Sequence, residues 1–75
     1  MDNITGRQVK INLNNFSERT LSNRFKNFLN NNKEKVFTAI LDIENEYTRM
    51  YVLKEDESNP KWLFYIDDLI VLGEW

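Results

Sequence analysis

The feature that most constrains the fold is the hydrophobic period, which changes from two to a helical value near residue 16 and then returns to two. Residues 7–13 alternate, and their apolar members Val9, Ile11 and Leu13 fall on one side of an extended chain. Gly6 stands directly before this segment as a turn residue. The alternation predicts a half-buried strand at the start of the chain.

The next segment, residues 17–30, has the period of an amphipathic helix. Its apolar residues stand at i, i+4, i+7 and i+8, which places them in one stripe: Leu21, Phe25, Phe28 and Leu29. Ser17 is placed to cap the N-terminus of this helix. Asparagines at positions 30–32 are placed to end it, because asparagine tolerates the left-handed conformation. We therefore predict one helix, over about 17–30.

The second half of the chain favours strands. Runs rich in β-branched and aromatic residues are separated by short polar segments, and they cover residues 36–43, 47–54, 62–67 and 69–72. The predicted order is strand, helix, three strands and a short last strand. There is no linker and no repeat, so we expect a single domain over residues 1–75.

This order resembles that of SH3-like small β-barrels. The likeness is carried by KVFTAILDIENEYTRMYVLKEDESNPKWLFYIDDLIVL, which predicts two hairpins, an acidic corner and a short closing strand. The resemblance implies about four or five antiparallel strands, with the helix 17–30 inserted between strands 1 and 2. The ALYDY-like stretch of peptide-binding SH3 domains is not found. The alternative is an α+β two-layer fold with the helix on a four-stranded antiparallel sheet.

Composition excludes most kinds of catalytic site. The 75 residues include no cysteine and no histidine, so there is no disulfide framework, thiolate nucleophile, imidazole base or usual zinc site. The sequence has no GxGxxG, P-loop or EF-hand pattern. We expect a protein that is not an enzyme and that needs no cofactor and no metal.

The sequence also carries signs of compartment and origin. No run approaches the roughly 18 apolar residues of a membrane span, and the N-terminus lacks the apolar core of a secretory signal. We therefore expect a cytoplasmic protein with no membrane contact. Eleven asparagines, with abundant isoleucine and lysine, are typical of AT-rich codons and favour a low-GC bacterium, its phages or its mobile elements.

The net charge of −2 conceals a split along the chain. Residues 1–40 hold seven Lys and Arg against three acids, a net of +4, and residues 41–75 hold three against nine, a net of −6. A surface with separated charges can steer and orient a charged partner. This split favours recognition of another protein over recognition of nucleic acid.

The acidic half provides the first candidate site. Its residues form three clusters, to which we add the C-terminal tryptophan as a candidate interface anchor: Asp42, Glu44 and Glu46; Glu55, Asp56 and Glu57; Asp67 and Asp68; Trp75. If the strand continued through the first cluster, its carboxylates would project from one face about every 6.6 Å. That spacing is near two phosphate steps of about 3.4 Å along DNA. The clusters would then imitate phosphates toward a basic groove, whereas the alternative interpretation is solvated turns that keep sheet edges from pairing.

The basic half provides the second candidate site. Its polar and positive residues surround the predicted helix away from the apolar stripe: Arg19, Asn23, Arg24, Lys26, Asn27 and Lys33. Such a surface can lie on phosphates, with asparagines available for backbone or base contacts. So few positive charges predict weak, salt-sensitive binding of nucleic acid. An ordinary solvated helix face is the alternative interpretation.

We interpret the sequence as a small non-catalytic protein that binds another protein, one with a basic groove. The more specific hypothesis is a phage or mobile-element accessory protein whose acidic face inhibits a host defence or nucleic-acid-processing enzyme. The first alternative is an SH3-like nucleic-acid-associated or adaptor module that uses the basic helix. The second is a small structural subunit that forms homodimers through an exposed sheet edge.

Overall fold

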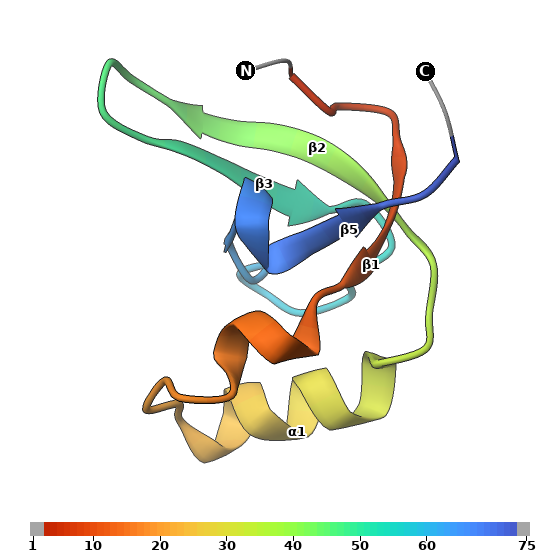
Figure 1. Cartoon of the computed structure of the whole chain (residues 1–75), viewed down its shortest axis with the longest axis vertical. Coiled ribbons are helices and arrows are strands. Elements are labelled where there is room, and N and C mark those ends of the chain that lie inside the picture. Colours follow the sequence, from red (N-terminus) through yellow and green to blue (C-terminus); the bar gives the residue numbers. More distant parts are fainter. Residues whose placement is uncertain (1–2, 74–75) are drawn as a thin grey trace.

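The structure is a computed structural model that describes residues 3–73 (Figure 1). Over these described residues, one α-helix and two short 3₁₀ helices accompany five strands. In chain order they are β1 (Gln8–Ile11), η1 (Leu13–Phe16), α1 (Asn23–Asn32), β2 (Phe37–Glu44), β3 (Arg49–Leu53), β4 (Phe64–Tyr65), η2 (Ile66–Asp68) and β5 (Leu69–Val71). The predicted order of elements, with the helix inserted between the first two strands, is confirmed.

The strands form one antiparallel sheet in the order β4-β3-β2-β1-β5. The long strand β2 joins its two parts, because its start pairs with β1 and the rest pairs with β3. Within residues 3–73 the end strands β4 and β5 are not paired with each other, so the sheet is not closed. A closed barrel is therefore not observed, and the finer SH3-like arrangement stays a prediction.

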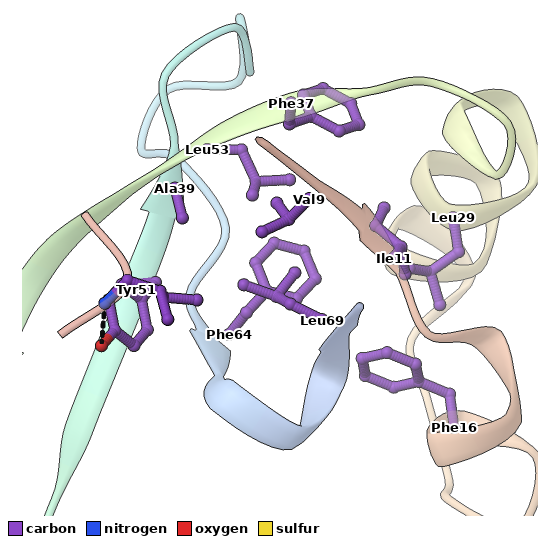
Figure 2. Packing of buried hydrophobic residues seen from close by; sticks show 11 residues of the cluster. Val9, Ile11, Phe16, Leu29, Phe37, Ala39, Tyr51, Leu53, Phe64 and Leu69 are labelled. Carbon is purple, nitrogen blue, oxygen red and sulfur yellow. Dashed lines mark hydrogen bonds between the residues drawn. The ribbon is translucent and has the colours of Figure 1, made fainter. Parts of the chain in front are cut away.

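The core lies on the concave side of the bent sheet (Figure 2). Val9, Ala39, Tyr51, Leu53 and Phe64 are fully buried there. They alternate with outward residues along β1, β2 and β3, as expected for strands with one buried face. The predicted inward positions of the first strand are confirmed at residues 9 and 11, whereas Leu13 lies in η1 and is exposed.

Helix α1 and η1 cover one end of this core (Figure 1). The rings of Phe16 and Phe25 meet edge to face at 5.5 Å, and Phe25 also packs on Trp62 at 4.8 Å. Leu29 is buried, while Leu21 and Phe28 are partly buried against the same core. The predicted apolar stripe is confirmed.

The helix begins later than predicted. Ser22, not Ser17, is the N-cap, because its Oγ accepts a hydrogen bond from the Phe25 N–H at 3.2 Å. The chain before it forms η1, and the Ser17 N–H and hydroxyl both bond to the Asn14 carbonyl at the end of that turn. The helix then continues through Asn32, where the Asn side chain donates to the Phe28 carbonyl at 2.7 Å.

The predicted strand 62–67 is also wrong in length. Only Phe64 and Tyr65 are paired with β3, and η2 begins at Ile66. The segment nevertheless alternates as a strand does, since Phe64 is buried while Leu63 and Tyr65 are exposed.

Candidate protein-binding surface

An apolar surface lies on the side of the sheet that faces away from the core. Directly opposed residues on antiparallel strands share a face. Ile40 is opposite Val52, Ile43 is opposite Met50, and Met50 is opposite Tyr65. Leu63 lies two residues before Tyr65 and borders the same depression as Val52. We call these six residues the outer apolar face: Ile40, Ile43, Met50, Val52, Leu63 and Tyr65.

The members of this face are exposed to different degrees. Ile43, Leu63 and Tyr65 are exposed, at 38%, 38% and 47% of their surface. Ile40, Met50 and Val52 are half-buried by their neighbours. Five of the six positions follow from the same alternation that buries Ala39, Tyr51 and Phe64 on the other side. Ile43 joins them because the pairing of β2 with β3 shifts between Leu41 and Ile43, which places it opposite Met50.

An open depression of about 500 Å³ extends this face at its edge. It is lined by Asp42, Val52, Pro60, Lys61 and Leu63. Asp42 comes from β2, and residues 60–63 come from the segment that leads into β4. The depression therefore has an apolar floor with one carboxylate and one ammonium group at its border.

The loop that supplies Pro60 to Leu63 is held by a buried aspartate. Asp56 accepts hydrogen bonds from the Ser58 N–H at 2.9 Å and from the Trp62 N–H at 3.0 Å. Lys61 Nζ donates to the Lys54 carbonyl at 3.1 Å and to the Asp56 carbonyl. These contacts fix the position of the Lys61 ammonium.

Two predicted acidic site residues lie inside the protein. Asp56 and Asp68 are only 3% and 2% exposed. Both carboxylates accept hydrogen bonds from backbone N–H groups, which explains their burial. The prediction that they belong to an exposed acidic surface is wrong.

Asp68 links the two 3₁₀ helices. Its Oδ2 accepts from the Tyr65 N–H at 2.9 Å, and its Oδ1 accepts from Arg19 Nη1 at 2.9 Å and from the Asn15 side-chain amide. The Arg19 guanidinium also lies 4.5 Å from the centre of the Phe16 ring. Arg19 therefore has a structural role beside η1 and η2, and it precedes helix α1 in the chain.

The even row predicted for Asp42, Glu44 and Glu46 is not formed. The pairing of β2 with β3 shifts between Leu41 and Ile43, so Asp42 is an extra residue at a β-bulge. Glu44 is opposite Arg49 and bonds to its guanidinium at 2.6 and 2.8 Å. The strand ends at Glu44, and Glu46 lies in the turn that follows.

The ion pair between Glu44 and Arg49 changes the pKa of Arg49. The hydrogen bond from Arg49 to Glu44 raises the pKa of the guanidinium above its ordinary value, against a smaller lowering by desolvation. The exposed Glu44 carboxylate is thus already matched by a positive charge. It adds little to an acidic surface.

Glu55 is used to fasten two strands. Its carboxylate accepts from the Thr38 N–H at 2.7 Å and from the Thr38 hydroxyl at 2.8 Å. Desolvation raises the pKa of Glu55, but the hydrogen bonds from Thr38, the Glu55 backbone N–H and the charge of Lys54 together outweigh it, so the pKa lies below its ordinary value. The side chain is exposed but is held in place.

The remaining predicted acidic residues are exposed on separate elements. Glu57 borders an open depression of about 400 Å³ beside Phe28 and Lys35. Asp67 lies in η2. The structure does not bring the clusters together into one acidic row. Trp75 lies outside the described residues.

The basic candidates are brought together only in part. Helical spacing places Asn23, Lys26 and Asn27 on one exposed side of α1, and Lys33 follows Lys26 by two turns at the C-cap. Arg24 borders a different depression, of about 430 Å³, with Lys61 and Trp62.

The outer apolar face is not predicted from the sequence, because both sides of β3 carry apolar residues and the pattern alone does not tell which side faces the core. Its members could have been found by counting outward from Phe64, since residues 63 and 65 must point away from it. Within residues 3–73 no group of three or more acidic residues is arranged to hold a metal ion. In the same part of the chain, every helix is too short or too polar to cross a membrane.

Comparisons of the chain with protein-family models, with curated proteins and with solved structures gave no match.

Proposed function

We propose that this protein is a small, non-catalytic protein-binding protein that contacts its partner through the outer apolar face. The observation that carries this proposal is the position of the six apolar side chains on the side of the sheet opposite the core. Apolar patches bordered by polar residues are typical of interaction surfaces on soluble proteins. Helix α1 and η1 cover an end of the core and leave this face uncovered (Figure 1).

Rigidity supports the same proposal. Five of the six residues lie on strands, and Leu63 follows a loop whose backbone N–H groups are bonded to buried Asp56. A face that is already ordered loses little conformational entropy when a partner binds. The absence of histidine and cysteine from the sequence supports the non-catalytic part of the proposal.

Fewer residues are available for an acidic binding face than the sequence indicated. Asp42, Glu46, Glu57 and Asp67 keep exposed carboxylates, and only Asp42 borders the outer apolar face. Inhibition of a host nucleic-acid enzyme by a phage or mobile-element protein stays a prediction, and it now rests on these four residues. The SH3-like class is supported by the strand order and by the 3₁₀ turn before the last strand.

The test compares capture by matched variants. Tagged protein is immobilised and exposed to a lysate of a low-GC bacterium that also expresses an untagged copy. We expect Ile43→Lys and Leu63→Lys to reduce capture of the partner at least about tenfold, because each places a charge in an apolar contact. Leu13→Lys is the control, since Leu13 is 39% exposed, like Ile43, but lies in η1.

Equal capture by Ile43→Lys, Leu63→Lys and the wild type would remove the outer apolar face from the proposal. An equal loss with Leu13→Lys would show that added charge alone explains the effect.

A second candidate is nucleic-acid binding at the start of α1. It is favoured by one observation, that Arg24 and Lys61 both border the depression that contains Trp62. Stacking on an aromatic ring beside positive charges is a common mode of single-strand binding. Binding of labelled RNA or DNA at low salt, lost in Arg24→Glu, is the measurement that supports it.

A further inference from the structure

The border of the outer apolar face carries two opposite charges. Asp42 and Lys61 line the same depression of about 500 Å³, whose floor is Val52, Pro60 and Leu63. Within residues 3–73 the Asp42 carboxylate has no hydrogen bond and no ion pair. Asp42 is the extra residue of the bulge in β2, and its side chain is exposed.

Lys61 is held in place but its charge is not neutralised. Its ammonium donates to two backbone carbonyls, of Lys54 and Asp56, and carbonyls carry no net charge. An ammonium has three N–H donors, so one remains for another acceptor. The face thus presents a fixed cation that can donate once more and an exposed carboxylate that can accept.

Such a surface is complementary to itself. When two identical faces meet about a two-fold axis, each residue i that contacts j is matched by j contacting i. Asp42 of each copy can then meet Lys61 of the other, while the apolar residues between them form the centre. A partner with only basic groups would leave Lys61 facing a like charge, which is unfavourable.

We propose that the partner of the outer apolar face is a second copy of this chain, in a two-fold symmetric dimer. The inference rests on the proposed function, because it uses the same face. The domain measures 32 × 27 × 25 Å, so one of its faces is large enough for the about 600–800 Å² per partner of a small specific interface.

The test is charge reversal followed by mixing. In both pairs of a symmetric dimer, Asp42→Lys places a second ammonium group against Lys61, and Lys61→Glu places a second carboxylate against Asp42. We expect each variant alone to raise the dimer dissociation constant about tenfold or more. An equimolar mixture of the two variants forms dimers again, because the mixed dimer has one pair of two introduced charges of opposite sign and one native pair.

The measurement is molar mass by sedimentation velocity at low salt, from the micromolar range to about 1 mM. The monomer has a mass of 9.1 kDa. The control pair is Glu18→Lys and Lys33→Glu, which makes the same changes of net charge at exposed positions of the α1 side. We expect each control to form dimers like the wild type, both alone and mixed.

Circular dichroism establishes that each variant is folded. If Lys61→Glu unfolds because its loop contacts are lost, Asp42→Lys alone decides the question, since Asp42 is exposed and its loss breaks no contact. The dissociation constant of Asp42→Lys must then rise relative to that of Glu18→Lys.

A wild-type monomer at every concentration overturns the dimer. Unchanged dimers in Asp42→Lys, or folded variants that do not recover on mixing, overturn the arrangement about Asp42 and Lys61. The proposed function is tested separately from the dimer. It stands if the monomer captures a different protein and this capture depends on Ile43. It falls together with the dimer if no protein is captured.

Discussion

Replacing Asp68 with alanine tests how the structure is held together at η2. One carboxylate with almost no exposed surface accepts hydrogen bonds from Tyr65, Arg19 and Asn15. These bonds join η1, which carries the core residue Phe16, to the turn before β5. Asp68→Ala removes all three acceptor contacts at once.

The cost follows from the surroundings of each donor. The partly buried Tyr65 N–H loses its acceptor, at about 1–3 kcal/mol. Arg19 is 44% exposed along its side chain and Asn15 is exposed, so both donors can turn to water, at about 0–1 kcal/mol each. We expect a total loss of about 1–5 kcal/mol, from a free energy of unfolding of roughly 4–11 kcal/mol for a domain of this length.

Urea denaturation measures this loss. With an m-value near 1 kcal/mol/M for a small domain, the midpoint falls by about 1 M or more. Asp67→Ala is the matched control, because Asp67 is the adjacent exposed aspartate in the same turn. We expect this substitution to change the free energy of unfolding by no more than about 0.5 kcal/mol. Asp68→Asn gives an intermediate loss, since its amide keeps one acceptor but points two N–H donors at existing donors.

Equal midpoints for Asp68→Ala and Asp67→Ala would refute the reasoning, because they would show that the buried carboxylate contributes nothing net. A loss in Asp68→Ala that Arg19→Ala reproduces in full would also refute it, since it would assign the energy to the exposed ion pair rather than to the Tyr65 N–H.

Three further substitutions have expected outcomes. Asp56→Ala leaves two backbone N–H groups without acceptors and should cost about 1–3 kcal/mol in urea, with faster hydrogen exchange in the loop. Tyr51→Phe removes the acceptor of the buried Ile4 N–H, a bond of 3.2 Å (Figure 2), and should cost about 1–2 kcal/mol in thermal unfolding. Because the pKa of Glu55 is lowered on folding, the contribution of Glu55 to stability is fully present above pH 4.5 and is lost as the pH falls through the folded pKa. Glu55→Gln should therefore lower stability by less than about 1 kcal/mol at pH 7 and by nothing at pH 2; an equal difference at both pH values would contradict this.

The periodicity of the apolar residues predicted the order of elements well, because it reports directly which residues are buried. The strand positions of Val9 and Ile11 and the helix stripe from Leu21 to Leu29 are all core contacts in the structure. The helix boundary was misplaced because two serines can each act as an N-cap. The choice of Ser22 over Ser17 depends on η1, whose contacts to η2 lie about 50 residues away in sequence.

The candidate site was harder to predict because charge alone does not tell whether a carboxylate faces solvent or a backbone N–H. Asp56 precedes Ser58 by two residues, which is the spacing at which an aspartate bonds to its own backbone in a turn. Asp68 follows Tyr65 by three and closes a similar turn from the other end. Both patterns are visible in the sequence, but the bonds to Trp62 and Arg19 that complete their burial are not.

A shortage of glycine explains why polar side chains close so many turns in the second half. The chain has two glycines, Gly6 and Gly73, and they are the residues with positive φ within 3–73. The turns between residues 44 and 68 therefore lack the left-handed conformation that would let the backbone close on itself. Side chains supply the missing acceptors instead: Asn45 for two N–H groups of the β2–β3 turn, Asp56 for the loop before β4, and Asp68 for η2. Part of the excess of acidic residues after residue 40 thus builds the turns, and a surface argument from net charge must count only the carboxylates that these turns do not use.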